Sequence, residues 1–168
     1  VVDISGFFTG NAAVRSSIAR EVAGAVEGIG FLTIIGHGVP QNLMEDVSAA
    51  YRSFFDLPLE IKRKYVNQAR NTNRGYVPYG DEFVASSHGK TAPPDWRETF
   101  AFGRFDVPED PYYSHADAGY AYEDNILPNE AAGMVATAKI FYRALEDLNH
   151  RLLQIFAAAL DIDETFFF

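Results

Sequence analysis

Residues 27–40 read E-G-I-G-F-L-T-I-I-G-H-G-V-P, and this stretch decides the fold. Residues 31–35 form a short apolar, β-branched run bounded by glycines, which predicts a strand buried on both faces. A helical pattern precedes this run, and residues 36–40 turn the chain into another helix. A helix, a buried strand, a turn and a helix make a scaffold without evident chemistry. The function must therefore be sought elsewhere in the chain.

Helical patterns flank the predicted strand on both sides. Asn11 is placed to cap a helix that runs to about Glu27. Pro40 lies in the first turn of a second helix, where its missing N–H is not needed, and this helix ends near Asp56. Residues 57–65 predict a short third helix, with Lys62, Arg63 and Lys64 on a solvated face. One apolar face of the first helix carries Val14, Ile18, Val22 and Val26.

The rest of the chain adds a few strands and one long helix. Residues 1–4 are a candidate strand, and residues 98–103 alternate well enough for a half-buried strand. Residues 104–129 show no usable period. Residues 128–160 hold helical spacing over a length of about 50 Å. The predicted fold class is therefore α+β and helix-rich, with domains at 1–127 and 128–168.

Composition limits the possible functions. The 168 residues carry a net charge of −9, which argues against a nucleic-acid or anionic-membrane partner. The chain has no cysteine, which excludes disulfides, zinc–thiolate sites and a thiol nucleophile. No apolar run approaches the roughly 20 residues of a membrane span, and no signal peptide is visible. We expect a soluble cytoplasmic protein, and its oligomeric state stays open.

Both ends suggest a piece of a longer polypeptide. The chain starts at Val1 without a methionine, directly in a β-like run. It stops at residues 166–168, an apolar Phe-Phe-Phe cluster that a complete domain rarely leaves at its end.

Several possible chemical motifs fail on their context. Gly28-x-Gly30 follows a helix and precedes a strand, the reverse of a dinucleotide fingerprint, so the glycine after the helix is interpreted as a C-cap. His115-x-Asp117 together with His150 resembles an iron-binding triad in composition, but its turn-like setting favours surface residues. No G-x-S-x-G, P-loop or H-E-x-x-H pattern occurs.

The two remaining histidines also have ordinary interpretations. His37, in a Gly-His-Gly turn, is predicted to be structural. His88, in a Ser/Gly/Lys loop, is predicted to be exposed.

Residues 74–83 combine aromatic and charged side chains as pocket linings do. Arg74, Tyr76, Tyr79 and Glu82 are the polar members of this stretch. On composition alone, an ordinary surface loop is the favoured interpretation. Residues 96–98, Trp-Arg-Glu, are equally ambiguous.

A series of motifs runs through the whole chain in a recognisable order. They are V-V-D-I-S at 1–5, G-I-G-F-L-T-I-I-G-H-G-V-P at 28–40, F-F-D-L-P-L-E-I-K-R-K-Y at 54–65, R-G-Y-V-P-Y-G at 74–80, E-T-F-A-F-G at 98–103 and N-I-L-P-N at 125–129. In these motifs the chain resembles the N-terminal region of the isopenicillin N synthase-like family of non-haem iron oxygenases. Most members of that family depend on 2-oxoglutarate.

The resemblance implies a double-stranded β-helix (jelly-roll) oxygenase whose barrel is largely absent from this chain. In that family the H-x-D…H iron triad and the Arg-x-Ser that holds 2-oxoglutarate follow the long helix. The implied cofactors of the complete parent are therefore Fe(II) and 2-oxoglutarate, and this chain carries no catalytic or metal-binding residue. His115-x-Asp117 precedes the long helix and is in the wrong place to be the triad.

The resemblance also changes the favoured interpretation of residues 74–83. The matching segment lies over the barrel mouth in the family, so Arg74, Tyr76, Tyr79 and Glu82 become candidate substrate-binding residues. Arg74 and Glu82 together would suit a zwitterionic, amino-acid-derived substrate. Residues 104–129 fit either a lid or a disordered surface excursion.

Two functions remain open. The first is part of an oxygenase that hydroxylates, desaturates or cyclises a small molecule, amino-acid-derived or a secondary metabolite. The second is a non-catalytic binding or scaffold module that has lost the barrel.

Overall fold

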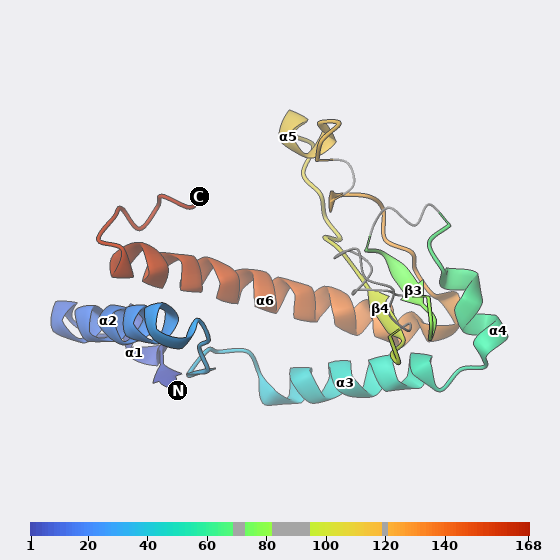
Figure 1. The fold of residues 1–168 in the computed structure, drawn as a ribbon, viewed down its shortest axis with the longest axis horizontal. Coiled ribbons are helices and arrows are strands. Elements are labelled where there is room, and N and C mark those ends of the chain that lie inside the picture. The colour runs from blue at the N-terminus through green and yellow to red at the C-terminus, as the bar shows by residue number, and fades with distance from the viewer. Residues whose placement is uncertain (69–72, 82–94, 119–120) are drawn as a thin grey trace. The chain divides into compact units, whose positions relative to one another are not determined.

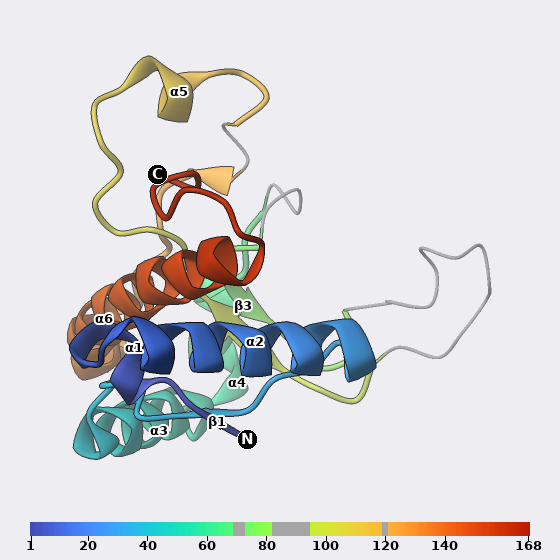
Figure 2. The ribbon, with the colours of Figure 1, turned by 90° about the vertical axis from the view of Figure 1, so that its left-hand side faces the viewer.

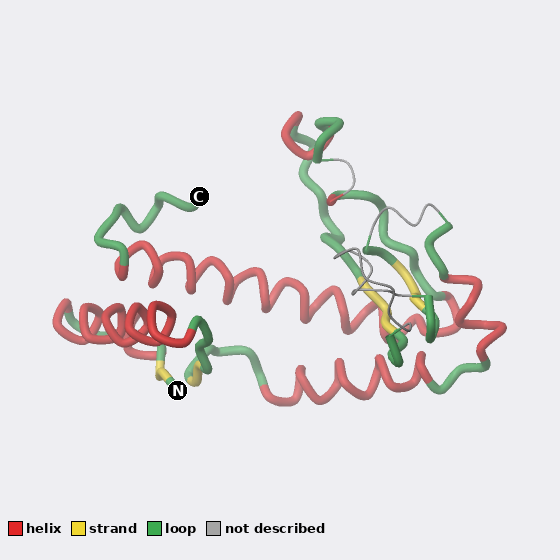
Figure 3. Tube along the Cα trace, viewed as in Figure 1, coloured by secondary structure: helices red, strands yellow, loops and turns green. Residues whose placement is uncertain are grey.

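The computed structural model describes residues 1–68, 73–81, 95–118 and 121–168 of the chain. Helices dominate the described residues and the strands are short (Figure 1, Figure 3), which confirms the predicted helix-rich class with few strands. The elements are β1 (Val2–Asp3), α1 (Ser5–Thr9), α2 (Ala12–Ile29), β2 (Ile34–Ile35), α3 (Gln41–Phe55), α4 (Leu59–Lys62), the 3₁₀ helix η1 (Arg63–Tyr65), β3 (Gly75–Val77), β4 (Thr99–Ala101), α5 (Pro111–Ser114), the 3₁₀ helix η4 (Asn129–Ala131) and α6 (Ala132–Ala159).

The chain divides into two compact units. One joins Val1–Met44 to Phe141–Phe168, and the other is the continuous segment Glu45–Ile140. The predicted long helix is confirmed as η4 followed by α6, whose 28 residues span about 42 Å. Among the described residues, none of the helices combines the length and the apolar character that crossing a membrane requires.

The first unit is built on a small parallel sheet. β1 pairs with β2 in the register Val2↔Ile34 and Asp3↔Ile35. The short helix α1 follows β1 directly and packs against α2 (Figure 2). The core beneath them brings Ile4 and Phe7 together with Val22 of α2 and Ile155 of α6, all fully buried.

α2 starts where the sequence places it and ends at Ile29, two residues later than predicted. The Asn11 side chain accepts hydrogen bonds from the N–H groups of Ala13 and Val14 at 3.0 and 3.1 Å, which confirms it as the N-cap. Gly30 adopts the left-handed conformation at φ 75° and its N–H bonds the carbonyl of Val26. The glycine after the helix is therefore a C-cap.

The strand predicted at 31–35 is shorter and more exposed than expected. Only Ile34 and Ile35 are in β2, Ile35 is 51 % exposed and Phe31 is 82 % exposed. The prediction of a strand buried on both faces is therefore wrong for this chain. The physical reason is that only one face of this run has a packing partner: Leu32 and Ile34 pack against the core, and the alternate residues Phe31 and Ile35 face solvent.

The turn after β2 is held by a cation from α6. Arg151 donates from Nη1 to the carbonyl of His37 at 3.1 Å, and its guanidinium lies 4.7 Å from the ring centre of Phe8. His37 Nδ1 accepts the N–H of Val39 at 3.1 Å. Gly38 has φ 81°, a conformation that suits glycine. His37 therefore has the structural role that was predicted.

The second unit has an aromatic core under an antiparallel strand pair. β3 pairs with β4 in the register Gly75↔Ala101, Tyr76↔Phe100 and Val77↔Thr99. Phe54 of α3 is fully buried and makes edge-to-face contacts with the rings of Tyr65, Tyr76 and Phe100, at centroid distances of 6.2, 5.8 and 4.7 Å.

Candidate substrate-binding region

A buried polar cluster joins α4 to the paired strands β3 and β4. Tyr76 donates its hydroxyl to Glu98 Oε2 at 2.5 Å, and Lys62 Nζ donates to the same oxygen at 2.8 Å. Lys62 Nζ also donates to the carbonyl of Phe55 at 2.9 Å. The exposed fractions of the Lys62 and Glu98 side chains are 9 % and 15 %. The prediction that Lys62 lies on a solvated face is wrong, because the Glu98 carboxylate gives its ammonium a buried partner.

This cluster sets the chemistry of Tyr76. The residue is 1 % exposed, and burial, reinforced by the hydrogen bond and the charge of Glu98, raises the pKa of its phenol above the usual range. The phenol therefore remains a protonated donor at neutral pH. Its one hydroxyl hydrogen is already directed at Glu98.

Arg74 lies at the entry to β3 with its guanidinium bound to backbone. Nη1 donates to the carbonyl of Asn73 at 2.9 Å and Nη2 donates to the carbonyl of Ala121 at 2.5 Å. The guanidinium occupies the space beside Gly103, where an added Cβ would lie 1.9 Å from Nη2. Arg74 Nε is buried and has no hydrogen-bond partner among the described residues. The side chain thus links β3 to the segments around residues 103 and 121.

Tyr79 is in a different environment from Tyr76. Its side chain is 63 % exposed and lines an open hollow together with Gly80, Asp95 and Trp96. Glu82, the fourth predicted residue, lies outside the described residues. Trp96 was not among the predicted residues. The available signal is its position beside Arg97 and Glu98, since aromatic and charged side chains together are typical of pocket linings.

The segment after β4 is tied back to that strand. Asn125 Oδ1 accepts the N–H of Gly103 at 2.7 Å, and its Nδ2 donates to the carbonyls of Gly103 and Arg104 at 3.1 and 3.0 Å. Farther out, the rings of Tyr113 and Tyr122 lie 4.8 Å apart at their centres. Described residues of this irregular segment therefore carry their own side-chain packing.

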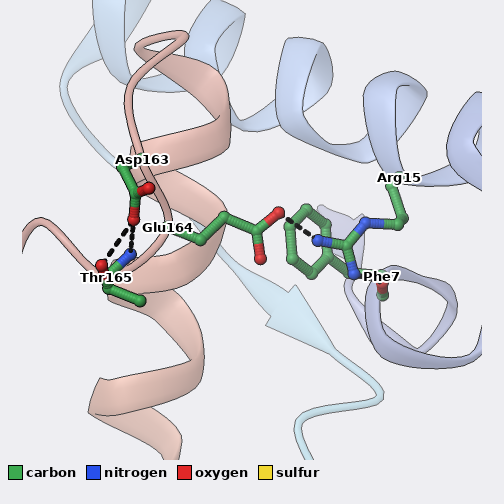
Figure 4. A network of polar contacts seen from close by, with 5 residues as sticks. All are labelled: Phe7, Arg15, Asp163, Glu164 and Thr165. Atoms are coloured by element: carbon green, nitrogen blue, oxygen red, sulfur yellow. Dashed lines mark hydrogen bonds and ion pairs between the residues drawn. The ribbon is translucent and has the colours of Figure 1, made fainter.

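A polar network in the first unit connects the residues after α6 to α2. Arg15 of α2 donates to the carbonyl of Phe7 at 3.0 Å and to the carboxylate of Glu164, and its guanidinium lies over the Phe7 ring (Figure 4). Asp163 accepts hydrogen bonds from the hydroxyl and the N–H of Thr165, which hold the pKa of its carboxyl below the usual range. These contacts tie the residues after α6 to α2.

The described residues do not fit an iron site. Within 1–68, 73–81, 95–118 and 121–168, no three histidine or carboxylate side chains form a metal-binding group. His115 Nδ1 lies 3.5 Å from Asp117 Oδ2, but these side chains are 66 % and 95 % exposed. The His150 ring instead contacts the ring of Phe168, at a centroid distance of 5.4 Å. His88 lies outside the described residues.

The sequence of the chain matches a known protein family over most of its length. Residues 1–130 match the family model described as the N-terminal region of a non-haem dioxygenase in morphine synthesis. The chain belongs to this family. The family assignment agrees with the resemblance seen in the sequence motifs.

Curated relatives include oxygenases from fungi and bacteria. The chain is 29 % identical over 174 residues to the 2-oxoglutarate-Fe(II) type oxidoreductase hxnY of Emericella nidulans, covering 99 % of this chain and 47 % of the relative. It is also 29 % identical over 169 residues to validamycin A dioxygenase of Streptomyces hygroscopicus subsp. limoneus, covering 99 % and 44 %. The chain thus spans about half the length of these relatives.

A solved structure shares the fold. The crystal structure of a 2OG-Fe(II) oxygenase family protein from Caulobacter crescentus matches with a TM-score of 0.77 and 23 % identity, covering 99 % of this chain and 50 % of that one. At this identity the likeness establishes the fold alone.

Proposed function

We propose that this chain is the N-terminal, helix-rich part of an Fe(II)- and 2-oxoglutarate-dependent oxygenase with a double-stranded β-helix core. The enzyme hydroxylates, desaturates or cyclises a small molecule, amino-acid-derived or a secondary metabolite. The match of residues 1–130 to the N-terminal dioxygenase family carries this proposal. In the family that the motifs resemble, the ligands of iron and 2-oxoglutarate follow the long helix, so the proposal assigns them to segments that this chain does not supply.

Within this chain, we assign substrate contact to the end of the β3–β4 pair. Tyr79 presents an exposed ring and is the proposed contact. Tyr76 and Arg74, whose polar atoms bind Glu98 and backbone carbonyls, hold the strands that position Tyr79. Glu82, three residues beyond Tyr79, is retained as a proposed substrate contact on family resemblance.

Two further features belong to the same proposal. The domain division is 1–127 for the N-terminal domain and 128–168 for the long helix that leads into the core. The enzyme acts in the cytoplasm, which is consistent with a chain that has no cysteine.

The test is coupled turnover by the complete polypeptide. Purified protein is supplied with Fe(II), 2-oxoglutarate and a panel of small molecules, and succinate is measured with and without each compound. We expect succinate above the background for at least one compound, and none after the metal is chelated. No 2-oxoglutarate turnover with any compound would refute the proposal and leave an oxidase or the non-catalytic scaffold module.

A Tyr79→Ala variant tests the substrate contact in the same assay. Losing the ring should lower kcat/KM about tenfold, mainly through KM, because the ring contributes binding rather than chemistry. Tyr112→Ala is the matched control, since Tyr112 is 67 % exposed and does not line the hollow beside Tyr79. Equal kinetics for the two variants would contradict the assignment of Tyr79.

A further inference from the structure

Two aromatic side chains project from the same end of the β3–β4 pair. The last paired residues at that end are Val77 and Thr99. Tyr79 follows Val77 by two residues and Trp96 precedes Thr99 by three, so both leave the strand pair at one end. Tyr79 and Trp96 also line the same open hollow, whose rim carries Asp95.

The residues next to Tyr79 and Trp96 in the two strands are held by hydrogen bonds and by burial. Glu98, two residues after Trp96, is held by hydrogen bonds from Lys62 and Tyr76. Tyr76 lies three residues before Tyr79 and is 1 % exposed in the aromatic core. Ligand-contacting side chains supported by a buried, hydrogen-bonded layer keep their positions better than side chains on an unsupported loop.

The rings themselves are left to solvent. Trp96 is 93 % exposed and Tyr79 is 63 % exposed, although large aromatic side chains are usually well buried. An exposed aromatic pair beside a carboxylate matches the composition of sites that bind rings and cationic nitrogen groups. Asp95 Oδ2 forms a loose ion pair with Arg97 Nε at 3.9 Å, and its side chain stays 32 % exposed, so the carboxylate is still open to a ligand.

We propose that Tyr79, Trp96 and Asp95 bind a flat ring that carries an N–H donor or a cationic nitrogen. The ring stacks on the two aromatic side chains and its nitrogen group faces the Asp95 carboxylate. An anionic ring is disfavoured by the same carboxylate. This inference rests on the proposed function, because it names the substrate class for the site around Tyr79.

Trp96 provides a direct reporter, since it is the one tryptophan of the 168-residue chain. The complete polypeptide is titrated with benzylamine, benzamide and benzoate, which share a phenyl ring and differ in charge, and the Trp96→Phe variant identifies the emission that comes from Trp96. We expect benzylamine and benzamide to change the tryptophan emission saturably. Benzoate should bind about fivefold more weakly than benzylamine. Equal or tighter binding of benzoate, or no response to any probe, would overturn the inference.

Variants are measured by ligand-observed NMR, which does not need the indole. Trp96→Ala should weaken benzylamine binding about three- to tenfold, while Trp96→Phe stays within about twofold. Asp95→Asn should bring benzylamine and benzoate to similar affinities. Tyr112→Ala, an exposed tyrosine outside the hollow, is the control and should bind as the unmodified chain does. Unchanged binding by Trp96→Ala would overturn the inference.

Binding and turnover separate this inference from the proposed function. If ring binding depends on Trp96 but no 2-oxoglutarate turnover occurs, the ring site is supported and the proposed oxygenase function is refuted. If turnover is unchanged in Trp96→Ala and Asp95→Asn, the oxygenase function is supported and the ring site is refuted.

Discussion

Replacing Lys62 by methionine should destabilise the protein strongly, although lysine is usually a surface residue. Methionine keeps the length and most of the apolar volume of the side chain and removes its charge. The Glu98 carboxylate then loses its cation, and the carbonyl of Phe55 loses its donor. The Tyr76 hydroxyl still donates its hydrogen bond to this largely buried anion.

The expected loss is about 3 kcal/mol in the free energy of unfolding. Breaking a buried ion pair from one side costs roughly 3–5 kcal/mol. The low end applies because Glu98 keeps its hydrogen bond from Tyr76 and its side chain is 15 % exposed. With a urea dependence of about 2 kcal/mol per molar, the midpoint should fall by about 1.5 M.

Urea unfolding followed by far-UV circular dichroism measures this loss, with Lys64→Met as the matched control. Lys64 also pairs with a glutamate, Glu130, at 3.1 Å, but the two side chains are 55 % and 35 % exposed, so less than about 1 kcal/mol is expected. Adding Glu98→Gln to Lys62→Met should recover about 1–2 kcal/mol by removing the unpaired charge. Equal losses for Lys62→Met and Lys64→Met would refute the assignment of a buried ion pair.

Two other substitutions probe the same unit. Gly103→Ala places a Cβ where the Arg74 guanidinium lies, and it should lower the free energy of unfolding by about 1–2 kcal/mol through the lost hydrogen bond to Ala121. In an Arg74→Ala background the same change should cost almost nothing. Additive losses in urea unfolding would contradict this. Tyr76 has a raised folded-state pKa, so its stabilising effect is complete below its unfolded pKa of about 10 and is lost as pH rises above that value. Tyr76→Phe should therefore lower stability at neutral pH by about 1 kcal/mol and make the decline above pH 10 shallower, which pH-dependent thermal unfolding measures; an unchanged slope would argue against the buried phenol.

Local signals in the sequence predicted the longer helices α2, α3 and α6. Asn11 and Gly30 are the N-cap and C-cap of α2, and each acts through its own backbone neighbours. Other elements depended on distant partners. β3 has three residues and exists through its pairing with β4, more than twenty residues away. α1, a single turn or so in S-G-F-F-T, has too few residues to show a period.

The candidate site was harder to predict than the fold, because burial decides the role of each side chain there. Tyr76 and Tyr79 are three residues apart in one motif, yet one phenol is buried and the other ring is exposed. The sequence pattern puts Lys62 on a solvated face because its partner, Glu98, is 36 residues later in the chain. Sequence spacing within a helix cannot reveal a partner of that kind.

The composition of the first core has a consequence for synthesis of the protein. Ile4 and Val22 are sealed by Ile155, so residues separated by more than a hundred positions close one core. The described residues of the aromatic core all lie within the continuous segment 45–140. As the chain leaves the ribosome, Ile4 and Val22 therefore wait for Ile155, while the segment 45–140 can fold before that core closes.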